Sequence, residues 1–212
     1  MAFASTELIV LRKTPYGETS LIVAGLSPDA GRISFLVRGA RRLSRRQYPV
    51  VDLFRRLEVQ YRPSATSSLQ RWSSGEVLED YGALASHRRR YAEAASLGRF
   101  LLRETAEGVP CPGAYSALRT ALARLAKTSR DASDAILLPA ARVGVLIAFL
   151  EENGELNRNA FATEDGARLE RLLRMATGEL PVPRLGATTW SQLDTWVLSL
   201  LHDADYAFGN DS

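Results

Sequence analysis

The spacing of apolar residues changes near residue 80, and this change constrains the fold more than any other feature of the sequence. Before it, short apolar-rich runs are separated by turn residues such as glycine and proline, a pattern typical of strands. The predicted strands cover residues 8–12, 20–26, 32–37, 52–61 and 69–78, with an interruption of the last one at residues 73–75. Five short strands favour a small closed barrel, because closure leaves no exposed sheet edge.

After residue 80, apolar residues recur every three or four positions, which is the spacing of one helix face. The predicted helices lie around residues 91–102, 115–125, 136–152, 163–176 and 189–201. Their apolar stripes are typical of packing against a core. The sequence therefore predicts an α+β chain of two domains, with a barrel over residues 1–80 and an all-helical domain over residues 81–212.

Arginines gather directly after the third predicted strand. The segment contains Arg38, Arg41, Arg42, Arg45 and Arg46 within nine positions. Like charges this close repel one another unless an anion lies between them, and the planar guanidinium fork suits phosphate oxygens. Gly39 would let the backbone approach such a ligand. The pattern favours a loop that binds a phosphate backbone, and the alternative interpretation is a solvated surface loop.

The charge is unevenly distributed along the chain. Residues 1–75 carry 12 basic and 5 acidic side chains, although the whole chain has a formal net charge of only +3. A basic first part suggests that this part meets a polyanion. The turn after the first strand adds Arg12 and Lys13, which could follow phosphates, and Tyr16, which could stack on a base. A packed loop tyrosine is the alternative for Tyr16, and Trp72 is predicted to belong to the core.

The sequence lacks the usual signatures of catalysis. It has no glycine-rich loop of the Gly-Lys-Ser/Thr type and no cluster with metal-ligand spacing. Cys111 is the only cysteine, and the only histidines, His87 and His202, lie far apart. We therefore expect no enzyme activity, no internal disulfide, no zinc and no other cofactor. No apolar run is long enough to cross a membrane and the N-terminus lacks a signal-peptide pattern, so the expected location is the cytoplasm.

Four short motifs follow one another in the basic part of the chain. They are Leu8-Ile9-Val10-Leu11-Arg12, Pro15-Tyr16-Gly17-Glu18-Thr19-Ser20, Gly31-Arg32 and Arg38-Gly39-Ala40-Arg41-Arg42. This series resembles the N-terminal signature of the RecO family, the bacterial recombination mediators of the RecFOR pathway. The resemblance covers about the first eighty residues, and the helical remainder agrees only in pattern. It implies a five-stranded OB-fold barrel followed by an all-helical domain.

The resemblance also implies a function in DNA repair and DNA recombination after DNA damage. Members of the family bind single- and double-stranded DNA and anneal complementary strands. They also bind RecR and the acidic C-terminal tail of single-strand-binding protein, and help to load RecA. Many members carry a four-cysteine zinc site in the helical half, whereas this chain has no cysteine in the matching region, residues 156–161. We therefore expect the zinc module to be absent.

An acidic tail that ends in an apolar residue needs a cation and an apolar pocket. The helix around residues 139–144 offers both, so Arg142, Val143 and Leu146 are the predicted partner-binding residues. The alternative is an ordinary surface arginine beside a core-facing helix. Two other functions also fit the sequence: an RNA-binding OB-fold protein, and a non-catalytic interaction scaffold whose arginines form a soluble surface.

Overall fold

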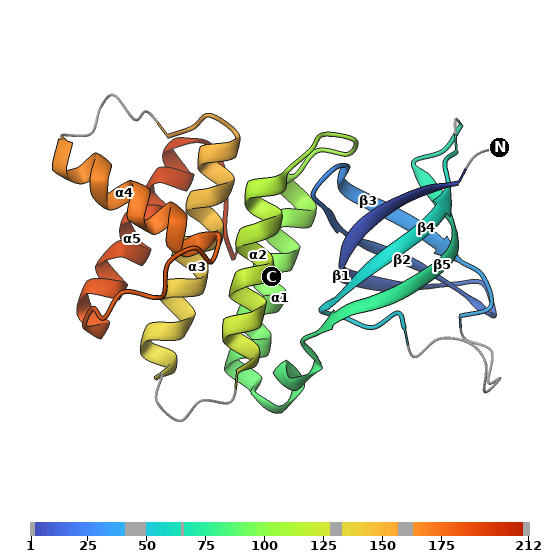
Figure 1. Cartoon of the computed structure of the whole chain (residues 1–212), viewed down its shortest axis with the longest axis horizontal. Helices are drawn as coiled ribbons and strands as arrows, with labels where there is room; N and C mark the ends of the chain where they lie inside the picture. Colours follow the sequence, from blue (N-terminus) through green and yellow to red (C-terminus); the bar gives the residue numbers. More distant parts are fainter. Residues whose placement is uncertain (1–2, 41–49, 65, 128–132, 157–162, 210–212) are drawn as a thin grey trace. The chain divides into compact units, whose positions relative to one another are not determined.

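The structure is a computed structural model, and it describes residues 3–40, 50–64, 66–127, 133–156 and 163–209. It contains a closed barrel followed by helices, which confirms the predicted fold class (Figure 1). The chain divides into two compact units. One comprises Met1–Gly82 with Leu101–Pro112, and the other comprises Ala83–Phe100 with Gly113–Ser212.

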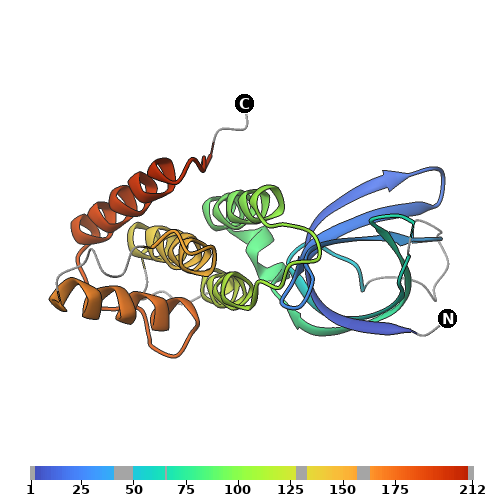
Figure 2. The same ribbon diagram turned by 90° about the horizontal axis from the view of Figure 1, so that it is seen from above.

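The first unit is built on a barrel whose strands curve around a common centre (Figure 2). Its strands are β1 (Ala4–Tyr16), β2 (Ser20–Ser27), β3 (Gly31–Val37), β4 (Arg55–Arg62) and β5 (Leu69–Asp80). They are hydrogen-bonded in the closed order β1-β2-β3-β5-β4, with β3 and β5 parallel and the other pairs antiparallel. Alternate side chains form the core: in β3, Ile33, Phe35 and Val37 are buried between half-exposed neighbours.

The interruption predicted at residues 73–75 does not end the strand, because β5 runs from Leu69 to Asp80. The register with β4 shifts there instead, since Tyr61 pairs with Trp72 and Gln60 with Ser74. Gly75 pairs with Val59 there, and its missing side chain leaves room for the indole of Trp72. A Cβ atom at position 75 would lie 2.4 Å from that ring. Trp72 packs edge-on against Phe35, with ring centroids 5.7 Å apart, and so lies partly buried against the core.

The segment Leu101–Pro112, called the strap below, belongs to the barrel unit and covers the turn between β2 and β3. It is held by backbone hydrogen bonds from Arg32 to Ala106 (3.2 Å), from Gly108 to Ala30 (2.9 Å) and from Cys111 to Pro28 (2.9 Å). Gly31 lies in this turn with a φ of +60°. A Cβ atom there would lie 2.4 Å from the carbonyl oxygens of Ala106 and Val109. The turn and the close approach of the strap therefore both require glycine.

The second unit is helical. A short 3-10 helix, Gly82–Ser86, leads into the helices α1 (Arg88–Glu104), α2 (Pro112–Ala126), α3 (Asp134–Glu152), α4 (Thr163–Ala176) and α5 (Ala187–Asp203). In this unit α3 lies between α2 on one side and α4 and α5 on the other (Figure 2). Every residue from 143 to 150 is buried, so α3 is the centre of the unit's core.

Candidate nucleic-acid interface

The residues predicted at the first turn lie at the end of β1, and they differ in pairing. Tyr16 precedes the turn at Gly17 and is 54% exposed, so its ring is not packed in the core. Arg12 is exposed, and no carboxylate partner is found for it among the described residues. Lys13 donates to Asp52, and this hydrogen bond lowers the pKa of the Asp52 carboxyl. Lys13 therefore has an acidic partner in the free protein.

Arg38 is exposed directly after β3. The other members of the arginine segment lie outside the described residues; they are Arg41, Arg42, Arg45 and Arg46. The role expected of these four side chains stays a prediction.

Arg38 lines a pocket that forms where β3 and β4 end and β5 begins. This arginine pocket has a volume of about 230 Å³ and is lined by Leu36, Arg38, Arg62, Arg71, Trp72 and Ser73. The strand register brings its cations together. Arg62 pairs with Arg71 across β4 and β5, and Arg71 pairs with Leu36 across β3 and β5. Arg38 follows Leu36 by two positions.

The arginine pocket has the electrostatics of an anion site. No carboxylate lines it, and within the described part of the chain no ion pair joins Arg38, Arg62 or Arg71 to an acid. Like charges directly opposite each other on neighbouring strands destabilise a sheet, and Arg62 faces Arg71 in this way. A phosphate between the guanidinium groups would relieve this repulsion and accept their hydrogen bonds.

Of the three arginines that line the pocket, the sequence predicts only Arg38 as a binding residue. Arg62 and Arg71 are single arginines near the ends of strands, and neither lies in a basic cluster of the sequence. Only the register of a closed barrel places them beside Arg38. The signal that could have found them is the pairing of β4 with β5, which spacing alone does not give.

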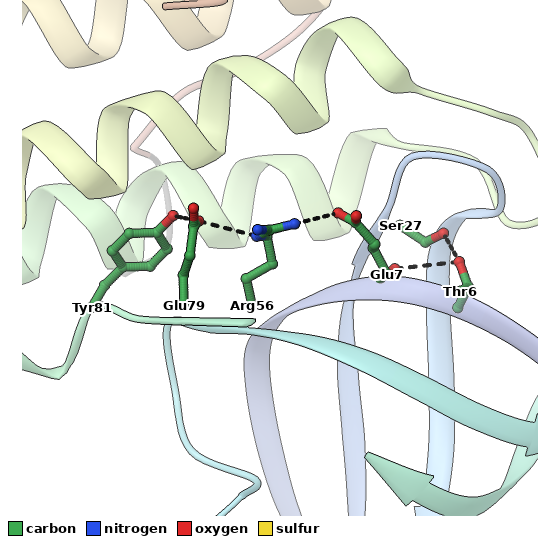
Figure 3. Close-up of polar contacts among 6 residues, drawn as sticks. All are labelled: Thr6, Glu7, Ser27, Arg56, Glu79 and Tyr81. Carbon is green, nitrogen blue, oxygen red and sulfur yellow. Dashed lines mark hydrogen bonds and ion pairs between the residues drawn. The ribbon is translucent and has the colours of Figure 1, made fainter. Parts of the chain in front are cut away.

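Arg56, at the other end of β4, differs from the pocket arginines because it is paired with carboxylates. It donates to Glu7 (2.9 Å) and Glu79 (3.0 Å), and Tyr81 donates to Glu79. Figure 3 shows these side chains in a row, with the hydrogen-bonded pair Thr6 and Ser27 beside Glu7. Burial disfavours the charged form of Arg56, but the two carboxylates outweigh burial and raise its pKa. Arg56 therefore serves the fold, and both of its carboxylate partners would have to be displaced before it could bind a ligand.

The partner site predicted on α3 is contradicted by the structure. Arg142 makes two hydrogen bonds to Glu93 (2.6 and 2.8 Å) and one to Asp194 (2.8 Å). Val143 and Leu146 are fully buried, so neither side chain is accessible to a partner. Helical spacing correctly indicated an apolar face on this helix, but that face is core, and acids from α1 and α5 neutralise the arginine. The hydrogen bond to Glu93 also raises the pKa of Arg142.

An apolar recess is present elsewhere in the helical unit, between α4 and α5. It has a volume of about 330 Å³ and is lined by Asp165, Arg168, Leu169, Leu172, Leu193 and Trp196. Arg168 is 70% exposed at the side chain and pairs with Asp165 at 3.0 Å on the surface. An exposed pair of this kind contributes little stability, so the guanidinium can exchange partners at low cost.

The described residues contain no group of three or more His, Cys, Asp or Glu side chains placed to hold a metal ion. Among their helices, none combines the length and the apolar character needed to span a membrane.

A closed five-stranded barrel of this strand order, followed by a helical unit, defines an OB-fold protein. Residues 1–81 match the family described as "Recombination protein O N terminal". The barrel part of the chain is therefore similar to the N-terminal domain of the RecO family.

Similar proteins named "DNA repair protein RecO" occur in several bacteria. The one from Syntrophobacter fumaroxidans is 26% identical over 65% of this chain and 54% of its own length. The one from Anaeromyxobacter sp. (strain K) is 34% identical over 45% of this chain and 39% of its own length. The one from Bacillus pumilus is 30% identical over 57% of this chain and 46% of its own length. The chain thus spans about half the length, or less, of these curated relatives.

Proposed function

We propose that this chain is a non-catalytic mediator of DNA repair and recombination that binds single- and double-stranded DNA and anneals complementary strands. The arginine pocket is the observation that carries the proposal, because three arginines and no acidic residue line one cavity. The match of residues 1–81 to the RecO family supports the DNA-repair role, since the similar proteins carry that name.

Binding of this kind needs no catalytic residue. Arginines on phosphates neutralise the charge that keeps two strands apart, and they do so without regard to sequence. Base pairing between the two strands then supplies the specificity. A protein that engages both strands thereby speeds their annealing.

The proposed interface extends from the arginine pocket over the adjacent turns. Arg12 and Tyr16 lie exposed at the end of β1 and would meet the same strand as Arg38. The other arginines after β3 belong to the proposed interface by their sequence position; they are Arg41, Arg42, Arg45 and Arg46. Lys13 is expected to contribute less, because it is paired with Asp52.

The experiment that tests the proposal is annealing of complementary DNA strands coated with single-strand-binding protein, with and without this chain. The proposal expects annealing to accelerate in proportion to the chain added. The variant Arg38→Ala, Arg62→Ala, Arg71→Ala should lose most of this acceleration while remaining folded. An unchanged annealing rate with the wild-type chain would contradict the proposal.

RNA of the same sequence distinguishes the first alternative function. An RNA-binding OB-fold protein would anneal RNA strands faster than DNA strands, whereas the proposal expects DNA to be at least as good a substrate. The scaffold alternative predicts that DNA binding does not depend steeply on salt. Its surface arginines would not contact phosphates, so no counterions would be released from the DNA.

The proposed partners are RecR, the acidic C-terminal tail of single-strand-binding protein and, indirectly, RecA. We propose that the tail binds in the α4–α5 recess, where Leu193 and Trp196 offer an apolar wall beside Arg168. Arg168→Glu should weaken binding of a tail peptide at least tenfold, about 1.4 kcal/mol. Arg171→Glu is the matched control, because it is exposed on the same helix outside the recess. Equal losses in both variants would contradict this location.

A further inference from the structure

Phe3 is an aromatic side chain on the surface of the barrel with no role in the core. It precedes β1 and is 55% exposed. The guanidinium carbon of Arg62 lies 4.8 Å from the centroid of its ring. This contact is a cation–π interaction, and it holds the ring in a defined place although much of it faces water.

Arg62 connects this aromatic ring to the arginine pocket. Ala4, which follows Phe3, pairs with Tyr61 across β1 and β4, and Tyr61 precedes Arg62. The same Arg62 lines the pocket with Arg38 and Arg71. Arg62 therefore belongs both to the aromatic contact with Phe3 and to the arginine pocket.

We propose that Phe3 and Arg62 form a stacking site for one unpaired base, next to the phosphate held in the arginine pocket. The inference rests on the proposed binding of nucleic acid by that pocket. An exposed aromatic ring stacks on a base without reading its identity, and an arginine plane does the same. In a duplex the bases are already stacked on one another, so only the phosphates are available. The site therefore favours single strands over duplex.

The test measures the affinity of the full chain for three oligonucleotides of equal length. They are a single strand, the same strand with abasic residues in place of nucleosides, and a duplex. Phe3→Leu keeps an apolar side chain but removes the aromatic face. We expect it to weaken binding to the base-bearing single strand about tenfold, and to leave the abasic strand and the duplex within about twofold of wild type.

Three further variants sharpen the test. Phe3→Trp should restore the affinity for the base-bearing strand, because indole also stacks. Arg62→Lys should lose part of the preference for single strands while the salt dependence of binding stays the same, because lysine keeps the charge without the plane. Val109→Ala is the matched control, since Val109 is 54% exposed in the same unit and should have no effect.

Two outcomes would overturn the inference alone. One is binding by Phe3→Leu to the base-bearing strand as tightly as wild type. The other is an equal loss on all three oligonucleotides, which would assign Phe3 to the fold or to the charge of the surface. If the wild-type chain bound none of the three, the proposed function itself would fail together with the inference.

Discussion

The two ends of β4 carry arginines with opposite fates. At its start, Arg56 lies between Glu7 and Glu79, close to the end of the barrel that the strap covers. At its end, Arg62 faces Arg71 without a carboxylate in the arginine pocket. At the first end of β4 the arginine is paired with two carboxylates. The nearby turn between β2 and β3 is held to the strap by backbone hydrogen bonds. The second end presents cations and an exposed aromatic ring to solvent.

This difference indicates that the role of an arginine in this barrel depends on whether a carboxylate is paired with it. A paired arginine stabilises the fold and is expensive to remove, because its carboxylates are left without compensation. An arginine among like charges destabilises the free protein slightly and contributes when an anion arrives. Substitutions at the strap end should therefore change stability, and substitutions at the pocket end should change binding.

Gly31→Ala should have the largest effect on stability. The left-handed backbone costs an alanine about 1–2 kcal/mol, and its Cβ atom would also collide with two carbonyl oxygens of the strap. We expect a total loss of about 3 kcal/mol in the free energy of unfolding, measured by urea denaturation. Gly17→Ala is the control: its φ is +58° but no atom lies within 4 Å, so only the backbone cost applies. Equal losses in both variants would mean that the strap does not stabilise the barrel.

Arg56→Met should rank second. It leaves Glu7 and Glu79 without their cation, but both carboxylates are more than a third exposed, so solvent reduces the cost to about 2 kcal/mol. The affinity of the folded protein for DNA should stay within about twofold of wild type. Denaturation and a binding titration on one preparation check both statements. A marked loss of affinity with intact stability would place Arg56 in the DNA interface.

Lys13→Ala should have the smallest effect, about 0.5 kcal/mol at neutral pH, because the pair with Asp52 is exposed. The pKa of Asp52 is lowered in the folded protein, so its contribution is present above the ordinary aspartate value and disappears as the pH falls through the lowered one. Wild type and variant should therefore converge in stability at acidic pH. The double variant Lys13→Ala, Asp52→Ala should bind DNA almost as wild type does, and a large loss would return Lys13 to the interface.

The sequence predicted the architecture well because strand and helix periodicity are local properties. It predicted an interruption at residues 73–75, where the strand instead continues through a register shift and Gly75 accommodates the Trp72 ring. It failed on Arg142 for a different reason. Helical spacing tells which residues share a face, but the acids that neutralise this arginine come from α1 and α5. It missed Arg62 for the same reason, since register brings distant strands together.

The dependence of DNA affinity on salt tests most directly whether the arginine pocket holds phosphates. The variant Arg38→Ala, Arg62→Ala, Arg71→Ala should lower the slope of log affinity against log salt for single-stranded DNA by about two units. The control variant Arg171→Ala, Arg174→Ala, Arg184→Ala removes the same charge from exposed positions of the helical unit and should leave the slope unchanged. Equal slopes for the pocket variant and wild type, or equal reductions in both variants, would contradict the account.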